Sequence, residues 1–409
     1  MSRVLKIFLG VLTAIGGFVD IGDLVTNAQV GARFGMSLGW VILLGVAGIS
    51  LFAEMSGRVV ACSGRATFDI IRERLGPRVG LLNLVGSMAV SMLTFVAEIG
   101  GIALSLELVT SVNEVLLAPV LGLIVWFILW KAKFSLIENV LGLLGLALLV
   151  FVVAVFKLGP DWGHLAHQFV AVQKPAQETW VTWCYYAVAL FGSAMTPYEV
   201  FFFSSGGVEE GWTKKSIGQM RANVLIGFPL GGVLSLSITA AATIVLLPLG
   251  VSVDSLAQTG LPVAVALGKV GLAIAILGFV AATLGAACET GLSTGYSIAQ
   301  YFGWQWGKFV RPREAARFHL VVALATALAI GILLTGVDPV KVTEASVVFS
   351  ALALPLTYFP ILVVANDRDY MGDQVNGRVI NIAAMALFVV VVVAAVAAIP
   401  LMIITGMGA

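Results

Sequence analysis

Long apolar runs separated by short polar breaks follow one another along almost the whole chain. A helix needs about 20 apolar residues to cross the hydrocarbon core of a bilayer, and eleven stretches meet that need. The predicted spans are 7–35, 38–62, 79–111, 114–131, 136–158, 179–205, 219–250, 262–303, 315–336, 341–366 and 378–405. No stretch alternates as the strands of a membrane β-barrel do. The pattern therefore predicts an all-α integral membrane protein.

Residues 65–75 form a shorter segment that mixes charged and apolar side chains. The segment is too short to span a bilayer, so we expect a short helix at the membrane interface. The predicted spans leave no room for a separate soluble domain. We therefore expect residues 1–409 to form a single membrane domain.

The composition agrees with this pattern and excludes several classes of function. Hydrophobic residues make up 60% of the chain and charged residues 11%, and the net charge is +1. The chain has no basic tail, so the lipid bilayer is an expected partner and nucleic acid is not. Cys62, Cys184 and Cys288 fall in different apolar segments without metal-ligand spacing, which predicts buried free thiols. With no nucleophile–base pair in the sequence, we expect neither an enzyme nor a bound cofactor.

The basic residues predict how the chain is oriented in the membrane. Arg3 and Lys6 precede the first apolar run, but no small-residue cleavage site follows, so this run is interpreted as a span and not as a signal peptide. Of the 23 Lys and Arg residues, 18 fall on the N-terminal side of the predicted spans, four on the other side, and Lys269 within the eighth span. Cytoplasmic connections carry the excess of positive charge. The expected location is the inner (plasma) membrane, with a cytoplasmic N-terminus and an external C-terminus.

Two carboxyl groups lie in the middle of the first predicted span. Asp20 and Asp23 are separated by Ile21 and Gly22. An acidic residue at the centre of a span costs about 3 kcal/mol, and two charges about 5 Å apart repel by about 3 kcal/mol at an effective dielectric constant of 20. A cation between the two carboxylates removes that repulsion. The alternatives are that both carboxylates cap the two halves of a kinked helix, or that one of them is protonated.

The sixth predicted span is interrupted by Pro197, in the segment 192–200. Proline lacks an amide hydrogen and clashes with the preceding turn, so backbone carbonyls near Ser193 lose their helical partners. Free carbonyls can bind cations, although proline kinks are common in membrane helices. Broken helices at equivalent places in two five-span halves are typical of inverted-repeat transporters. We therefore expect one repeat over 7–158, a second over 179–366, and an extra span over 378–405.

The motifs at these breaks resemble those of the Nramp family of divalent-metal transporters, and the resemblance covers most of the chain. The family pattern Asp-Pro-Gly-Asn, followed by Thr-Asn-x-Gln-x-Gly-Ala, is matched by residues 20–23 and 26–32. Further similar positions are Ala97–Glu98, Glu138, Thr294–Gly295, Gln300 and Leu354–Pro355. The resemblance implies a LeuT-like fold with helices 1 and 6 broken at mid-membrane. It also implies a metal site between these helices, formed here by Asp20, Asp23, Ser193, Thr196 and Tyr198.

The chain departs from the family pattern at this implied site. The family's Met-Pro-His is matched by Thr196, Pro197 and Tyr198, Asp23 stands in place of the family Asn, and Ile21 in place of the proline. A thioether favours softer transition metals, whereas hydroxyl, carbonyl and carboxylate oxygens suit hard ions such as Mg²⁺. The changes are similar to those in the Nramp-related magnesium transporters of prokaryotes.

The positions that resemble the family's proton route have also changed. A third-span acid is matched by Phe95 and the sixth-span histidine by Tyr198. A second sixth-span histidine is matched by Phe203, and the tenth-span glutamine by Ser346 or Val347. The resemblance therefore implies transport without proton coupling. Three other acids, Glu98, Glu199 and Glu289, are candidates for lining or gating the ion pathway, with a structural role as the alternative for each. Glu54 is expected to pair with Arg58 one turn further along.

These observations predict a secondary transporter that moves Mg²⁺, and also Mn²⁺, into the cytoplasm down its electrochemical gradient. A divalent ion gains about 4.6 kcal/mol per 100 mV of membrane potential, which is enough to drive uptake. A first alternative is a proton-coupled Mn²⁺/Fe²⁺ importer of the Nramp type. A second is a sodium-coupled carrier of organic solutes, which the two fixed acids disfavour because they repel a substrate carboxylate.

Overall fold

A computed structural model describes residues 19–408, apart from the side chains of Ser135 and Glu138. Within this part of the chain all regular elements are helices. The long ones are α2 (Ile21–Phe34), α3 (Gly39–Ser63), α4 (Thr67–Thr110), α5 (Glu114–Lys131), α6 (Phe134–Gly145), α7 (Leu149–Leu158), α9 (Trp180–Ala194), α10 (Pro197–Glu209), α11 (Ile217–Leu249), α12 (Leu256–Phe302), α13 (Ala316–Leu333), α14 (Pro339–Ala365) and α16 (Arg378–Ile404). The short helices are η1 (Gly35–Leu38), η2 (Leu146–Leu148), α8 (Trp162–Val170), η3 (Lys214–Ser216), α15 (Arg368–Met371) and η4 (Gly372–Gln374).

The helices follow the predicted spans closely. Ten stretches of the described residues are long and apolar enough to cross a membrane, and the first of them, Ile21–Ser63, joins α2, η1 and α3. These ten stretches therefore contain helices for all eleven predicted spans. Residues 7–18 of the first span lie outside the described residues.

Two glycines divide long helices at equivalent places in the chain. Gly76 (φ 85°) separates a short helix from the third span within α4, and Gly268 (φ 67°) does the same before the eighth span within α12. A side chain is strained at such positive φ values, which glycine adopts freely. The short helix predicted at 65–75 is thus present as the first part of α4. The eighth predicted span, 262–303, lies within α12 and includes Lys269, but the kink at Gly268 just before Lys269 was not predicted.

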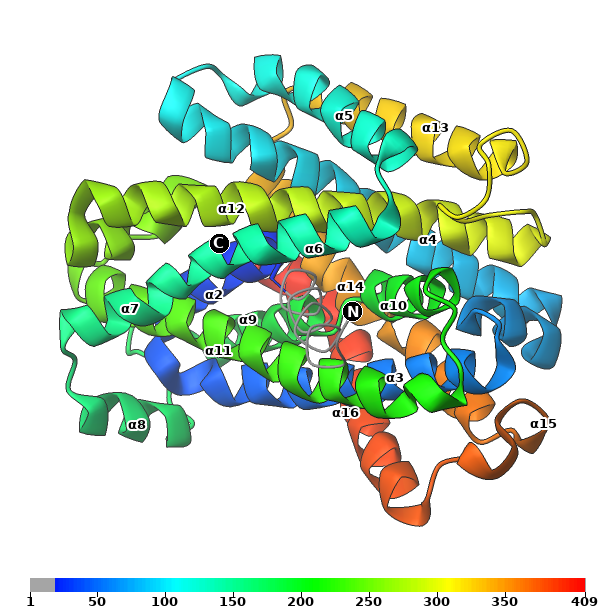
Figure 1. Cartoon of the computed structure of the whole chain (residues 1–409). Coiled ribbons are helices and arrows are strands. Elements are labelled where there is room, and N and C mark those ends of the chain that lie inside the picture. The colour runs from blue at the N-terminus through cyan, green and yellow to red at the C-terminus, as the bar shows by residue number, and fades with distance from the viewer. Residues whose placement is uncertain (1–18, 409) are drawn as a thin grey trace.

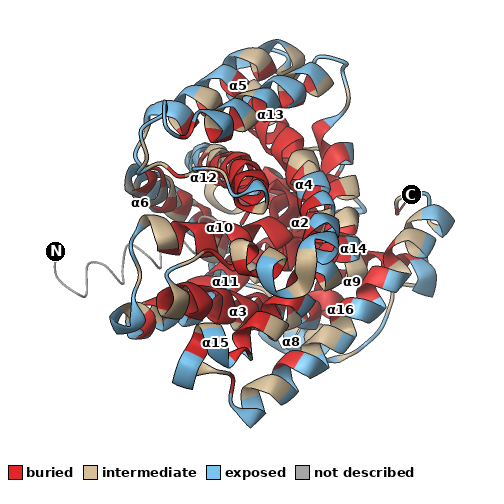
Figure 2. Cartoon of the chain, turned by 90° about the vertical axis from the view of Figure 1, so that its right-hand side faces the viewer, coloured by how far each residue is buried: buried red, intermediate tan, exposed pale blue. Residues whose placement is uncertain are grey.

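The helices form a bundle around α2 and the pair α9/α10 (Figure 1). The most extensive contact between helices joins α4 to α12, while α11 packs on α2 and α3, and α14 packs on α4 and α16. Buried residues concentrate at the centre of the bundle, and α5, α13 and α16 lie at its edge (Figure 2). This arrangement places the interrupted helices in the most protected part of the molecule.

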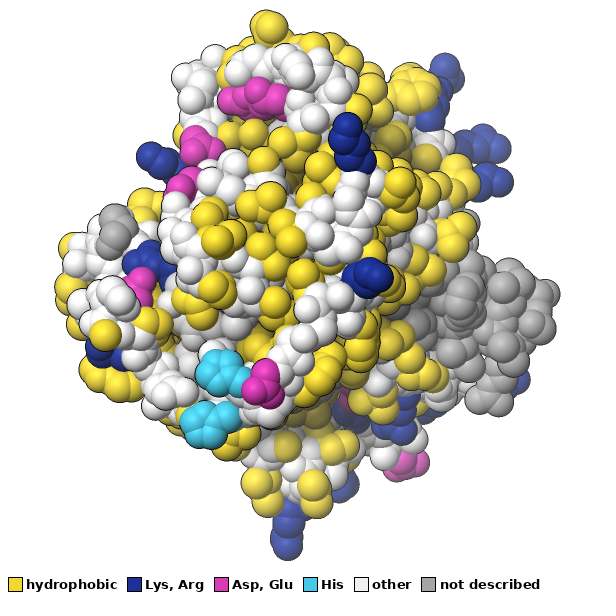
Figure 3. Space-filling view, turned by 90° about the vertical axis from the view of Figure 1, so that its left-hand side faces the viewer, with side chains coloured by type: hydrophobic (Ala, Val, Ile, Leu, Met, Phe, Trp, Pro, Cys, Tyr) yellow, Lys and Arg dark blue, Asp and Glu magenta, His cyan; other side chains and the backbone are white. Residues whose placement is uncertain are grey.

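The outside of the bundle is apolar, as expected for a protein surrounded by lipid. Large hydrophobic side chains such as Leu116, Val270 and Val396 are exposed. Hydrophobic side chains cover much of the face in Figure 3, with charged ones scattered among them. One burial prediction was wrong: all three cysteines are free thiols, but Cys184 is exposed and Cys62 only half-buried. A thiol behaves as a small hydrophobe, so an outward position in an apolar span costs little.

Candidate metal site

The break in the sixth span lies between α9 and α10. Met195 (φ −127°, ψ 52°) and Thr196 (φ −66°, ψ 131°) leave the helical conformation, and Pro197 is the first residue of α10. Proline fits this position because the first amide of a helix has no intrahelical partner. The Tyr358 hydroxyl donates a hydrogen bond to the freed Met195 carbonyl at 3.2 Å. The sequence therefore stops one helix and starts another inside the bundle.

The described part of the first span begins with α2, which Asp20 caps. The Asp20 carboxylate accepts a hydrogen bond from the Asp23 amide at 2.8 Å, so the capping role considered for Asp20 is present. Glu98 of α4 supports the same helix end, since its Oε1 accepts from the Ile21 amide at 3.1 Å. A Cβ on Gly22 would lie 2.9 Å from Asp20 Oδ1 and from Val347 Cγ1. Glycine is therefore required where α14 approaches this turn.

Two hydroxyl groups from the α9/α10 break bind the two carboxylates. Ser193 Oγ donates to Asp23 Oδ1 at 3.1 Å, and Tyr198 Oη donates to Asp20 Oδ2 at 2.9 Å. Asp20 and Asp23 are 3% and 1% exposed. Among the described residues, Asp23 Oδ2 is buried without a hydrogen-bond partner. The fold thus brings four of the five predicted site residues together and leaves one carboxylate oxygen uncompensated.

Thr196, the fifth predicted residue, lies at the same break but contacts a different acid. Its hydroxyl donates to Glu199 Oε2 at 3.3 Å. The Thr196 hydroxyl therefore faces the carboxylate one turn along α10, and no hydrogen bond joins it to Asp20 or Asp23 in the described part of the chain.

Three further acids surround this arrangement. Glu98, Glu199 and Glu289 are all buried, at 0%, 5% and 7% exposure. Ser293, one turn after Glu289 on α12, donates to the Tyr198 carbonyl at 3.2 Å, which places this part of α12 against the start of α10. Glu98 Oε2 and Glu289 Oε2 have no hydrogen-bond partner among the described residues. Burying a charged carboxylate without a partner costs free energy. A bound proton or a nearby cation lowers this cost for both oxygens.

Asn27 is part of this site, although sequence reasoning gave it no role. Its side-chain amide donates to the Asp23 carbonyl at 2.8 Å and to Asp23 Oδ1 at 3.1 Å, and its own oxygen accepts from Thr239 at 3.1 Å. Asn27 therefore orients Asp23 and fixes α2 against α11. The sequence did hold a signal for this contact: Asn27 lies one helical turn after Asp23, inside the motif 26–32, so the two side chains lie on the same face of the helix.

The donor set of this site consists of oxygen atoms. The described residues contain no group of three or more His, Cys, Asp and Glu side chains with metal-binding geometry. The carboxylates and hydroxyls that meet here are instead the ligands of hard divalent cations, which keep several waters. The hydrogen bonds that join Asp20 and Asp23 to Ser193 and Tyr198 involve neither sulfur nor imidazole.

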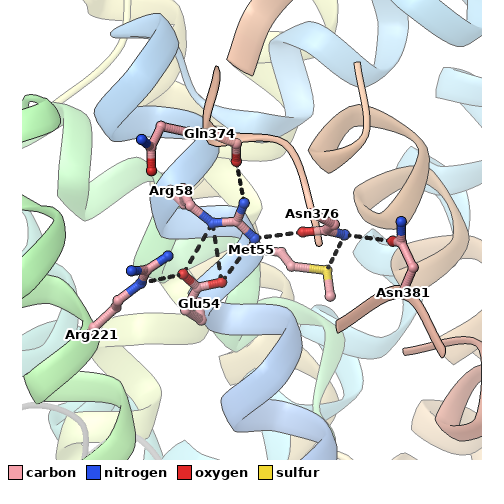
Figure 4. Close-up of polar contacts among 7 residues, drawn as sticks. All are labelled: Glu54, Met55, Arg58, Arg221, Gln374, Asn376 and Asn381. Atoms are coloured by element: carbon pink, nitrogen blue, oxygen red, sulfur yellow. Dashed lines mark hydrogen bonds and ion pairs between the residues drawn. The ribbon is translucent and has the colours of Figure 1, made fainter. Parts of the chain in front are cut away.

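A separate polar cluster joins three elements away from this site (Figure 4). Arg58 is 2% exposed and binds both carboxylate oxygens of Glu54 at 3.0–3.2 Å, which confirms the predicted pair. Arg221 of α11 also binds Glu54, at 2.8 Å. Arg58 reaches Asn376 Oδ1 at 2.5 Å and the Gln374 carbonyl. The cluster therefore ties α3 and α11 to the segment that leads into α16.

The fold and the site define a multi-pass membrane protein with an oxygen-lined polar centre between α2 and the α9/α10 break. The family model described as "Natural resistance-associated macrophage protein-like" (Nramp) matches residues 10–400. The chain therefore belongs to the Nramp family.

Relatives with known names are transporters of divalent metal cations. The chain is 26% identical to the divalent metal cation transporter MntH of Deinococcus radiodurans over 407 residues, covering 96% of this chain and 89% of the relative. It is 25% identical to the protein of the same name from Klebsiella pneumoniae (strain 342) over 388 residues, covering 92% and 89%.

Solved structures show the same fold. A mutant of the manganese transporter from Eremococcus coleocola aligns with a TM-score of 0.70 at 17% identity, covering 95% of this chain and 84% of that one. Mhp1, a nucleobase-cation-symport-1 family transporter, aligns with a TM-score of 0.63 at 17% identity, covering 97% and 91%. The expected LeuT-like fold is confirmed. Divalent metal transport is confirmed at the level of the family.

Proposed function

We propose that this chain imports a hard divalent cation, with Mn²⁺ and Mg²⁺ as its substrates, through the site formed by Asp20, Asp23, Ser193, Thr196 and Tyr198. The observation that carries the proposal is the buried, unpartnered Asp23 Oδ2 beside hydroxyls from the broken sixth span. The names of the relatives favour manganese. The oxygen-only donor set supports Mg²⁺ as a second substrate, because neither a thioether nor an imidazole selects against it.

Proton coupling is the second candidate feature, and the comparisons favour it over the uncoupled transport expected from the sequence. Phe95 and Tyr198 stand where the family pattern has an acid and a histidine. These two changes argued against a proton route. The buried and unpartnered oxygens of Glu98 and Glu289 supply other groups that could carry protons next to the site. A proton-coupled Mn²⁺ importer therefore remains a full alternative to uncoupled Mg²⁺ uptake.

Inward transport follows from the membrane potential, which draws a divalent cation toward the negative, cytoplasmic side. We propose a cytoplasmic N-terminus and an external C-terminus in the plasma membrane, with repeats over 7–158 and 179–366. The matching kinks at Gly76 and Gly268 support two related halves, because each precedes the third span of its half. A sodium-coupled carrier of organic anions is disfavoured, since Asp20 and Asp23 repel a carboxylate at this site.

Ion flux into proteoliposomes tests the function and separates the two forms of coupling. Vesicles containing the purified chain, a pH-sensitive dye and a metal-sensitive dye are exposed to Mn²⁺ or Mg²⁺ at a negative internal potential. Uptake of both ions without acidification supports uncoupled transport. Uptake of Mn²⁺ with acidification, reduced in Glu289→Gln, supports the proton-coupled form. Failure to carry either ion contradicts the proposal.

A further inference from the structure

A groove of about 400 Å³ lies on the outer edge of the bundle, at the end of α5 and the start of α13. Its walls include Trp126, Trp130, Arg313, His319, Leu320 and Ala323. The two helices pack against each other and form the upper edge of the molecule in Figure 1. The groove is remote from Asp20 and Asp23, so the metal site does not explain it.

The inner part of the groove is suited to an acyl chain. Leu320 is 58% exposed although its side chain is fully apolar. Trp126 and Trp130 stack with their ring centroids 5.4 Å apart and form one wall. Tryptophan is enriched at the level of the lipid head groups, where its ring meets both apolar and polar surroundings. The groove is therefore apolar within the bundle edge and bordered by aromatic rings.

The rim of the groove is basic. Arg313 lines it directly, and Lys131 is held beside it, with its Nζ 3.8 Å from the centre of the Trp130 ring. In the described part of the chain, neither Arg313 nor Lys131 makes an ion pair. Arg317 lies in the first turn of α13, four residues after Arg313, with its guanidinium carbon 5.3 Å from the centre of the Trp304 ring. Arg313 and Lys131, with Arg317 close by, place positive charge at the mouth of an apolar groove. This charge complements the phosphate group of a lipid, and the groove complements its acyl chains.

The position along the spans agrees with this chemistry. Lys131 ends α5 and Ala316 begins α13, so the rim lies where both helices leave the apolar layer. The charge distribution places this end of the bundle on the cytoplasmic side, whose leaflet carries the anionic lipids. Basic pockets between helices on that side bind anionic head groups.

We propose that the groove between α5 and α13 binds an anionic phospholipid, with its phosphate at Arg313 and Lys131 and an acyl chain along Leu320 and Trp126. The lipid bridges two peripheral helices that pack on α4 and α12, which in turn surround the metal site. This binding is independent of the transported ion.

Native mass spectrometry of the full-length chain in detergent tests the proposal. The chain is titrated separately with phosphatidylglycerol and with phosphatidylcholine of the same acyl chains, and bound lipids are counted. We expect at least fivefold tighter binding of phosphatidylglycerol to the wild type. Lys131→Gln/Arg313→Gln should bind the two lipids equally. Lys214→Gln/Lys215→Gln, which removes two exposed cations elsewhere at the same end, should keep the preference.

A groove-filling variant and a soluble competitor distinguish a phospholipid from a free anion. Leu320→Trp fills the groove without changing its charge, and should weaken phosphatidylglycerol binding as well. Glycerol 3-phosphate in tenfold excess should not displace the lipid, since it lacks the acyl chains. Displacement would show a site for a soluble anion and overturn the proposal. Equal binding of both lipids by the wild type, or an unchanged preference in Lys131→Gln/Arg313→Gln, would overturn it too.

Discussion

Ser193 donates a hydrogen bond to Asp23 Oδ1 at 3.1 Å, joining two residues that lie 170 positions apart in the chain. The serine is in the last turn of α9 and the aspartate in the first turn of α2, so the bond connects the α9/α10 break to the start of α2. It occupies one carboxylate oxygen and leaves Asp23 Oδ2 without a partner among the described residues. The contact therefore orients the Asp23 carboxylate and leaves its second oxygen available to a cation.

Replacing Thr196 by methionine should change the metal preference. Thr196→Met introduces a thioether at the break between α9 and α10 and removes the hydroxyl that contacts Glu199. Soft ligands favour softer ions, so we expect Cd²⁺ to bind at least tenfold more tightly and Mg²⁺ more weakly. Calorimetric titration of both ions measures the change. Thr110→Met, at the exposed end of α4, is the control, and the same gain in Cd²⁺ affinity there would refute the assignment.

Gly192 is expected to tolerate no side chain, because the backbone of α14 lies directly against it. A Cβ at this position would lie 2.2 Å from the Val347 carbonyl oxygen. Gly192→Ala should therefore lower the melting temperature in detergent, with a cost of about 1–3 kcal/mol for overpacking. Gly331→Ala is the matched control, since a Cβ there meets no atom within 4 Å. Equal melting temperatures for the two variants would contradict this close packing of α9 on α14.

The cluster around Arg58 should matter more for stability than a surface ion pair. Glu54→Gln leaves the buried Arg58 guanidinium without a countercharge, and breaking a buried pair costs about 3 kcal/mol. Glu73→Gln makes the same chemical change in the exposed pair Arg65–Glu73 and should leave stability almost unchanged. Denaturant unfolding in detergent compares the two. A larger loss for Glu73→Gln would show that burial of the Arg58 cluster does not stabilise the fold.

Most of the fold could be predicted from the sequence because a bilayer imposes simple rules on it. Apolar runs of sufficient length predicted the long helices from α3 to α16, but not the short helices α8 and α15, and Pro197 marked the interruption between α9 and α10. The kink at Gly268 was missed, because the apolar run continues through it and one glycine is a weak signal. The exposure of Cys184 was also missed, since in lipid an apolar residue need not face inward.

The site could be predicted only in part. Asp20 and Asp23 stood out because carboxyl groups are rare within spans, the helix break pointed to Ser193, and the family resemblance to Tyr198. The contact of Thr196 with Glu199 depends on the direction of one side chain and not on its place in the sequence. Asn27 was missed as a partner of Asp23 because its role depends on the packing of α2 against α11.

Calorimetric titration of Mn²⁺ and Mg²⁺ against the wild type and Asp20→Asn tests the metal site most directly. Asparagine keeps the shape of the side chain and its acceptor oxygen for the Asp23 amide, but removes the charge. Asp373→Asn, at an exposed position in η4, is the matched control. We predict that Asp373→Asn binds both ions as tightly as the wild type, and that Asp20→Asn binds them at least tenfold more weakly. Unchanged binding by Asp20→Asn would contradict a site between α2 and the α9/α10 break.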